Sequence, residues 1–417
     1  MLFREHRPPA AEATPGAWLR LAALGAAAAT ALVVISGALQ LDVPHKTMGV
    51  LAAPLLLAVV LAAYGAHRRL LAISTVALGL FGLESAVGAV VALAGDPAWA
   101  GGLHLAFAGL AFAASLLSAA TAFRGEQVPA GAWRDYLELT KPRIMVLLLI
   151  TAACGMFVGA GGVPELWQLA VLLVGGALAS GGASALNHYL DRDIDGLMGG
   201  RTAERPIVAG RLIAPRALEF GLVLSAFSFV LLGSLINVLT AALALAGGLF
   251  YVVVYTGWLK RSTVENIVIG GAAGAVPPLV GWAAATGNLT LPAIFLFLIV
   301  FFWTPPHFWA LALLIKNQYA AAEIPMLPVV RGDRETARRI VIYSLVLALS
   351  TLLPFLSQTV GGIYLATALL LDGVFIYLAM DLSRHTNLAG ARRLFHFSLL
   401  YLALLFSAMA LDTVLIA

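Results

Sequence analysis

Long hydrophobic runs alternate with short polar connections along almost the whole chain. A helix needs roughly 20 apolar residues to cross a bilayer, and an uninterrupted helix satisfies its own backbone groups in hydrocarbon. The pattern therefore predicts an all-α integral membrane protein with about thirteen transmembrane helices. Their approximate ranges are 18–39, 48–66, 70–94, 102–123, 143–160, 166–190, 214–234, 238–256, 264–284, 290–313, 340–358, 361–381 and 393–416.

Composition supports the membrane assignment. The chain is 61% hydrophobic and only 11% charged, whereas soluble domains carry about 25% charged residues. One long polar connection, 125–140, joins hydrophobic blocks and carries no obvious chemistry. We interpret it as a linker between a four-helix block, 1–124, and a nine-helix bundle, 141–417.

The basic residues predict the orientation. Cytoplasmic loops are enriched in Lys and Arg. With a cytoplasmic N-terminus, alternate connections hold all of the 25 basic residues except Lys46. We therefore expect a multi-pass protein of the cell (inner) membrane, with its C-terminus outside. Because these cations are spread over many short loops, nucleic acid is not an expected partner.

The strongest local signal lies at the end of the sixth hydrophobic run. Asn187, Asp191 and Asp195 are spaced i, i+4, i+8, which places them within about 80° of one another on a helix. Carboxylate and amide oxygens on one face suit a hard cation such as Mg2+, which shares carboxylates with phosphate oxygens. The alternative is a solvated helix end, but ionisable groups capping a membrane helix are usually functional.

Cations stand at the predicted cytoplasmic ends of several helices. Arginine and lysine can hold a diphosphate and stabilise its charge as it leaves. The alternative is simple anchoring at the membrane surface. The candidates for diphosphate binding are Lys141, Arg143, Arg205, Lys260 and Arg261.

One aromatic stretch runs from Trp303 to Trp309 inside a predicted span and contains two prolines and His307. The prolines predict a kinked or broken helix, which membrane proteins tolerate beside a cavity or packed protein. Trp303 and His307 are thus candidate substrate contacts. Ordinary packing, with a satisfied buried histidine, is the alternative.

These motifs together resemble the UbiA superfamily of intramembrane prenyltransferases. Several stretches are similar to its protohaem IX farnesyltransferase (haem O synthase) branch over about 135–417. They are Leu139-Thr140-Lys141-Pro142-Arg143-Ile144, Asn187 to Asp195, Arg205-Pro206, Tyr255 to Arg261, Trp303 to Leu311, and Ile324 to Val330.

The resemblance implies nine helices around a cavity that opens to the cytoplasmic side. It implies that Mg2+, held by Asn187, Asp191 and Asp195, and farnesyl diphosphate act together, and that the farnesyl group passes to haem b. Asp191, Asp195, Lys260 and Tyr255 would be catalytic, and Tyr319 would help to bind substrate. The chain departs from the family at His188, often Asp, and at Asn317-Gln318, usually acidic, which leaves a second Mg2+ open.

The first block is weakly similar to half of haem A synthase, around His45 and His104. Two imidazoles at one depth of a four-helix bundle can ligate a haem iron. These two histidines are therefore candidate haem ligands; two interfacial histidines without a ligand are the alternative. Contact with haem A synthase is a further expectation.

Two other functions fit parts of the pattern. A quinone precursor or another aromatic molecule could replace haem b as the acceptor. A haem carrier or secondary transporter would also use broken helices and intramembrane charge.

Overall fold

The computed structural model describes the chain except for 1–16, 39–41, 65–67, 95–97, 123–131 and 417. Every described element is a helix, which confirms the predicted all-α class. The chain divides into two compact units, Met1–Ala130 and Gly131–Ala417. Part of the segment interpreted as a linker, 125–140, falls outside the described residues, and the rest contains a short helix, α5 (Trp133–Leu139).

Four helices form the first unit: α1 (Ala17–Ala38), α2 (Asp42–Ala63), α3 (Arg68–Ala94) and α4 (Ala98–Ala122). Helix α1 packs against α2 and α4, and α3 packs against α4. The buried interior consists mostly of alanine, leucine and valine. One hydroxyl pair, Thr30 Oγ1 and Ser115 Oγ at 2.6 Å, links α1 to α4 within this apolar core.

Long helices build the second unit. They are α6 (Pro142–Ala160), α7 (Leu166–Leu190), α10 (Ala214–Leu235), α11 (Val238–Leu249), α13 (Asn266–Thr286), α14 (Leu291–Leu314), α17 (Gly332–Leu356), α18 (Gly362–His385) and α19 (Leu388–Ile416). Helix α11 continues as a π-helix, η1 (Phe250–Leu259), and then as α12 (Lys260–Ser262). Helix α14 runs without interruption through Pro305 and Pro306, so the predicted break is absent.

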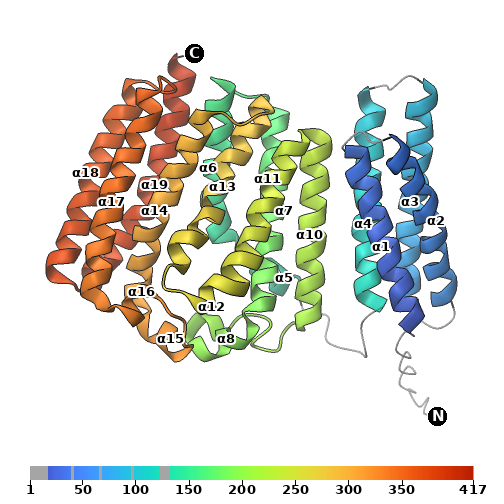
Figure 1. The fold of residues 1–417 in the computed structure, drawn as a ribbon, viewed down its shortest axis with the longest axis horizontal. Helices are drawn as coiled ribbons and strands as arrows, with labels where there is room; N and C mark the ends of the chain where they lie inside the picture. Colours follow the sequence, from blue (N-terminus) through green and yellow to red (C-terminus); the bar gives the residue numbers. More distant parts are fainter. Residues whose placement is uncertain (1–16, 39–41, 65–67, 95–97, 123–131, 417) are drawn as a thin grey trace, which may run out of the picture. The chain divides into compact units, whose positions relative to one another are not determined.

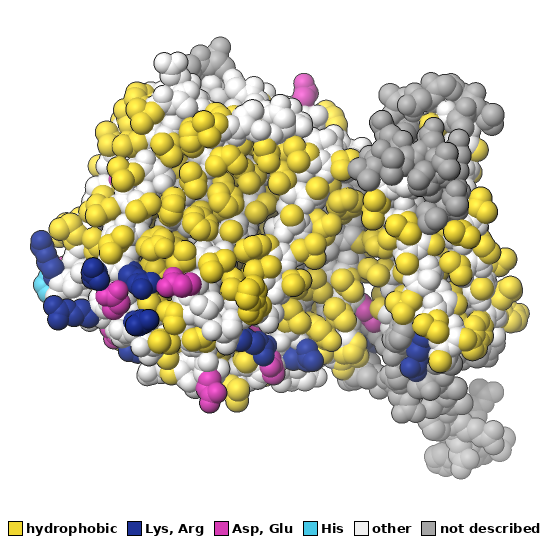
Figure 2. Space-filling model, viewed as in Figure 1, with side chains coloured by type: hydrophobic (Ala, Val, Ile, Leu, Met, Phe, Trp, Pro, Cys, Tyr) yellow, Lys and Arg dark blue, Asp and Glu magenta, His cyan; other side chains and the backbone are white. Residues whose placement is uncertain are grey.

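Short helices gather at one end of this unit, which we call the α8 end (Figure 1). They are α5, α8 (Arg192–Met198), α9 (Gly200–Ala203), α15 (Lys316–Ala321) and α16 (Leu327–Val330). Figure 2 shows hydrophobic side chains across the middle of one face of the unit, and charged side chains toward the α8 end. This distribution is typical of a bundle whose middle lies in lipid and whose charged end lies in water.

Eleven of the described helices are long and apolar enough to cross a membrane, and nine of these belong to the second unit. Two shorter apolar helices, Gly49–Ala63 and Ala106–Ala122, lie in the first unit. The multi-pass membrane class is thereby confirmed. The total of thirteen spans and the orientation of the termini stay predictions.

Helices α6 and α13 approach unusually closely because glycines stand at their crossing. A Cβ atom on Gly281 would overlap the carbonyl oxygen of Ala152, and one on Gly155 would overlap that of Pro278. Small residues at such crossings let membrane helices pack by backbone contact. This contact holds the second half of α6 against α13.

We expect Gly281→Ala to destabilise the second unit by about 1–3 kcal/mol, since the overlap is with backbone and cannot be relieved by a rotamer change. Thermal unfolding of the purified protein in detergent measures the loss. Gly373→Ala is a suitable control, because nothing lies within 4 Å of a Cβ built there. Equal unfolding temperatures for the two variants would contradict the close crossing.

Candidate functional site

Three oxygen-bearing side chains meet where α7 ends and α8 begins. Asn187, Asp191 and Asp195, which we call the acidic cluster, are each at most 3% exposed. The amides of Asp191 and Asp195 each donate to the backbone oxygen four residues earlier, both at 2.9 Å. The helical register thus continues across the junction and keeps the three residues on one face. The nitrogen Nδ2 of Asn187 donates to Asp191 Oδ2 at 2.8 Å.

A different cation contacts each member of the acidic cluster. Lys141 Nζ donates to Asn187 Oδ1 at 2.7 Å, Lys260 Nζ to Asp191 Oδ2 at 2.6 Å, and Arg205 Nη1 to Asp195 Oδ2 at 2.5 Å. These cations come from the start of α6, from α12 and from the loop after α9. The structure therefore brings together three of the five predicted diphosphate-binding cations.

The other two predicted cations lie at the edge of the cluster or outside it. Arg261 donates two hydrogen bonds to Asp193 and one to the Leu190 oxygen, and its guanidinium lies 3.8 Å from Asp191 Oδ1. The hydrogen bond from Arg261 lowers the pKa of Asp193 to about 2. Arg143 is exposed, and among the described residues no hydrogen bond or ion pair ties it to the cluster.

The backbone of Lys141 adopts an energetically unfavourable conformation where the residue joins the cluster. This residue has φ 50° and ψ 59°, the left-handed region, immediately before Pro142 opens α6. Such a conformation costs an ordinary residue about 1–2 kcal/mol and often marks a functional position. Burial, with a smaller contribution from Arg205, lowers the pKa of Lys141 to about 7. An approaching anion would favour its charged form.

Tyrosines lie close to the cluster. The ring of Tyr255, in η1, stacks on Tyr251 at 5.7 Å between centroids and packs against Gly270 of α13, where a Cβ would overlap it. Tyr319, in α15, is partly buried, and burial raises its pKa to about 12. Tyr319 therefore offers a neutral hydroxyl group to a ligand at neutral pH. Tyr255 offers a ring whose position is fixed by packing.

Helix α15, which carries Tyr319, meets the start of α9. Gln318 lies beside Gly200, about 3.5 Å from a Cβ built there, and Asn317 is exposed. The nearby carboxylate of Asp333 is paired with Lys316 at 2.7 Å. Among the described residues, no group of three or more His, Cys, Asp or Glu side chains forms a metal site. The two carboxylates and one amide of the acidic cluster stay the predicted set of metal ligands.

Two carboxylate oxygens of the acidic cluster lack hydrogen-bond partners in the described structure, which indicates whether the cluster suits a metal ion. Asp191 Oδ1 and Asp195 Oδ1 are buried and have no hydrogen-bond partner among the described residues. Buried carboxylate oxygens are costly unless they are paired or coordinate a metal. The residues therefore fit Mg2+, which takes carboxylate oxygens together with phosphate oxygens and water. Asn187 Oδ1 fits less directly, because it accepts from Lys141.

The aromatic stretch of α14 has partners within the protein. Trp303 Nε1 donates to the Ser398 backbone oxygen at 2.8 Å, and His307 Nδ1 lies 2.6 Å from Ser398 Oγ. The Trp303 and His307 rings stack at 4.4 Å, and His307 also stacks on Phe395 of α19. The structure thus places both side chains in the α14–α19 contact. Their role in substrate binding stays a prediction.

Sequence reasoning did not single out Thr256. Its buried hydroxyl oxygen accepts from Asn187 Nδ2 at 3.1 Å and helps to orient that amide. Nothing in the local sequence distinguishes this threonine from other hydroxyl residues in apolar runs. Only the packing of η1 against α7 identifies it.

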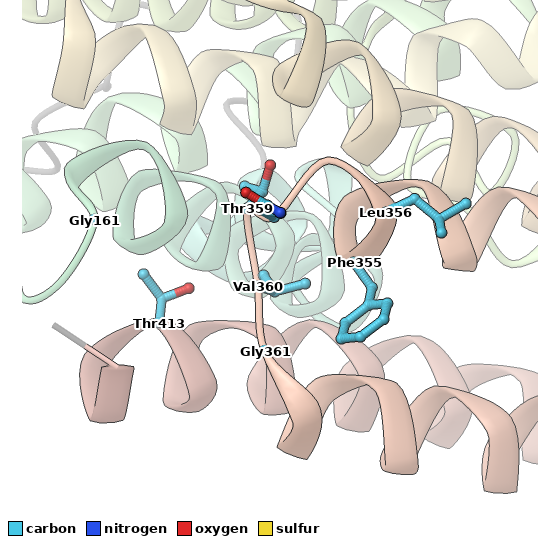
Figure 3. A pocket seen from close by; sticks show the side chains of 8 residues that line it. Gly161, Phe355, Leu356, Thr359, Val360, Gly361 and Thr413 are labelled. Atoms are coloured by element: carbon cyan, nitrogen blue, oxygen red, sulfur yellow. The ribbon is translucent and has the colours of Figure 1, made fainter.

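A surface pocket lies at the opposite end of α6 from Lys141, beside Gly161 and lined by the end of α17, the loop that follows it and α19 (Figure 3). Its volume is about 510 Å³, and no Asp, Glu, Lys, Arg or His side chain lines it. It lacks groups that could hold a metal or a diphosphate, so the candidate chemistry stays at the α8 end.

Of the two candidate haem ligands in the first unit, the His45 side chain lies outside the described residues. His104 lies across Gly88 of α3, its Nδ1 2.9 Å from the Glu84 backbone oxygen and 3.6 Å from the Glu84 carboxylate. A carbonyl oxygen can only accept, so Nδ1 carries the proton in the neutral ring and Nε2 keeps its lone pair.

Comparison with solved structures shows the fold. A digeranylgeranylglyceryl phosphate synthase matches 67% of this chain and 98% of its own, with a TM-score of 0.57 and 18% identity. A UbiA homologue from Archaeoglobus fulgidus, bound to DMAPP and Mg2+, matches 66% of this chain and 99% of its own, with a TM-score of 0.50 and 17% identity.

Sequence relatives agree with this fold. The protoheme IX farnesyltransferase of Symbiobacterium thermophilum is 53% identical over 67% of this chain and 94% of its own. That of Chloroflexus aurantiacus is 41% identical over 96% of this chain and 72% of its own. That of Roseiflexus castenholzii is 52% identical over 67% of this chain. The match covers 52% of that relative, about half of its length. The UbiA prenyltransferase family profile matches residues 148–405. The chain therefore belongs to the UbiA prenyltransferase family, as its motifs predicted.

Proposed function

We propose that the second unit transfers the farnesyl group of farnesyl diphosphate to a vinyl group of haem b, giving haem O and diphosphate. The observation that carries the proposal is the acidic cluster, with two unfilled carboxylate oxygens and three cations around it. The names of the relatives supply the acceptor and the prenyl chain length.

Residues of the acidic cluster would hold Mg2+, which when bound supplies Lewis-acid stabilisation of the diphosphate leaving group. Lys260 and Arg205 already lie against the carboxylates and can neutralise the remaining phosphate charge. Lys141 can exchange Asn187 Oδ1 for a phosphate oxygen, which releases that oxygen for the metal. The cations thus stabilise charge where it develops as the bond breaks.

The bond between C1 of the farnesyl chain and the diphosphate oxygen breaks, and its electron pair leaves with diphosphate. The π electrons of the haem vinyl group form a new bond to C1. Water adds to the resulting cation on the porphyrin side and loses a proton, leaving a hydroxyl group. Aromatic side chains near the cluster, such as Tyr255 and Tyr251, can stabilise the allylic cation.

Mass analysis of products tests the function. Purified protein with labelled farnesyl diphosphate and haem b should release diphosphate and yield a farnesylated hydroxyethyl haem. Aromatic acids offered in place of haem b should stay unmodified; their prenylation would show a different acceptor. A protein that moves haem without releasing diphosphate would be a carrier or transporter, and the proposal would be wrong.

Removal of divalent ions should abolish turnover. Without the metal, the two carboxylates face the diphosphate directly, so we expect EDTA to lower the rate about a hundredfold or more. Added Mg2+ should restore the rate, which diphosphate release would follow. Turnover that persists at full rate in excess chelator would contradict the role given to the acidic cluster.

The first unit is a candidate haem-binding module. The support is the weak similarity of the stretch around His104 to half of haem A synthase, together with the hydrogen bond between its Nδ1 and the Glu84 carbonyl, a contact typical of metal-ligating histidines. The full-length protein purified with haem should then show a Soret band that His104→Ala shifts or removes. An unchanged spectrum would leave His104 as a packing residue of α3 and α4.

Orientation and partners complete the proposal. The positive-inside pattern supports a cytoplasmic N-terminus, a cytoplasmic active site and an outer C-terminus. Haem O released into the membrane would be available to haem A synthase, with which we expect contact.

A further inference from the structure

His188 is a buried histidine whose two ring nitrogens lack hydrogen-bond partners in the described part of the protein. It lies in the last turn of α7, beside Asn187, and is 3% exposed. Neither Nδ1 nor Nε2 has a hydrogen-bond partner among the described residues. Buried polar atoms are nearly always hydrogen-bonded, so a histidine with two unpaired nitrogens needs an explanation.

The surroundings of His188 contain the groups of the acidic cluster. On a helix, residue 188 stands about 100° from residue 187 and about 60° from residue 191, next to the face that carries the cluster. Lys141, Arg205 and Lys260 are the charges that act most strongly on the imidazole. One turn deeper, the Ser184 hydroxyl is also buried and without a partner in the described part of the chain.

We infer that His188 binds the diphosphate group of the prenyl substrate. A neutral imidazole offers one N–H donor and one acceptor nitrogen. The donor hydrogen-bonds a diphosphate oxygen that Lys141, Arg205 and Lys260 draw into the site. The other nitrogen accepts from an ordered water carried in with the ion and its diphosphate. Both unpaired atoms then gain partners in the bound state. This assignment rests on the proposed function, since it takes diphosphate as the ligand.

Binding without turnover tests the inference. Full-length protein in detergent is titrated with inorganic diphosphate plus Mg2+ by calorimetry, for the parent and for four variants. His188→Phe and His188→Leu remove both hydrogen-bonding atoms and keep an apolar side chain. His188→Asn keeps a donor and an acceptor. His396→Phe is the matched control, an exposed histidine bonded to the Arg392 oxygen.

Loss of one hydrogen bond to a charged group should weaken diphosphate binding about 10- to 100-fold in His188→Phe and His188→Leu. We expect His188→Asn and His396→Phe to stay within about threefold of the parent. Unfolding temperature in detergent checks each variant. Having two apolar variants keeps the test decisive if one of them does not fold.

Three outcomes would overturn the inference. Equal binding by the parent and both apolar variants would show that His188 does not touch diphosphate, while the proposed function would stand. A change confined to haem b, seen as a shifted Soret band or a raised KM for haem alone, would show that His188 serves the porphyrin. A parent protein that fails to bind diphosphate with Mg2+ would remove the proposed function itself.

Discussion

Asp191→Ala should lower turnover about a thousandfold or more, because three contributions disappear together. The substitution removes Asp191 Oδ1, the proposed metal ligand, which has no hydrogen-bond partner in the described structure. It leaves the buried Lys260 ammonium without its carboxylate at 2.6 Å. It also removes the acceptor that orients Asn187 Nδ2. Diphosphate release with saturating farnesyl diphosphate and haem b measures the effect.

Asp193→Ala is the matched control for this prediction. Asp193 lies only two residues away, but its side chain is 59% exposed and pairs with Arg261 at the edge of the site. Exposed ion pairs contribute little, so we expect at most a few-fold change. Normal turnover of a folded Asp191→Ala protein would refute the metal role; equal losses in both variants would mean that net charge, and not the cluster geometry, matters.

Lys260→Met should be the second most damaging change, with turnover reduced about a hundredfold or more. The methionine keeps the length and apolar character of the lysine stem, so packing is largely preserved. The loss is the positive charge against Asp191 and against the departing diphosphate. The effect should fall mainly on kcat, since the charge on the leaving group is greatest as the bond breaks.

Lys316→Met provides the comparison for Lys260→Met. Lys316 also pairs with an aspartate, Asp333 at 2.7 Å, but both side chains are more than one third exposed. Solvent screens such a pair, and we expect turnover within a few-fold of the parent. A Lys260→Met protein that keeps normal kcat and only a raised KM would show that the charge binds substrate without assisting bond cleavage.

The acidic cluster could be predicted from sequence because its geometry is local. A spacing of i, i+4, i+8 fixes one helical face, and the backbone register continues through the α7–α8 junction. The partners of the cluster could not be predicted individually. Lys141 and Lys260 reach Asn187 and Asp191 across 46 and 69 residues of chain. Charge and position made them candidates, but only the packing of α6, α7 and η1 pairs them.

The two prolines of the aromatic stretch predicted a kinked or broken helix, and α14 is not broken. Two adjacent prolines ordinarily interrupt a helix, because they remove backbone donors. Pro305 and Pro306 are buried, and α14 continues through them. Trp303 and His307 have partners on α19. The sequence did not predict these partners on α19, and the role of both side chains in substrate binding stays a prediction.

The winding of η1 sets where the Lys260 ammonium lies. A π-helix carries more residues per turn than an α-helix, so the residues after Phe250–Leu259 are rotated relative to those of a regular span. Shortening this segment by one residue would change the angle at which Lys260 projects from the helix and move its ammonium away from Asp191. The position of the Lys260 ammonium therefore depends on the number of residues in η1. Deletion of one neutral residue there should reduce activity although every ionisable group is kept.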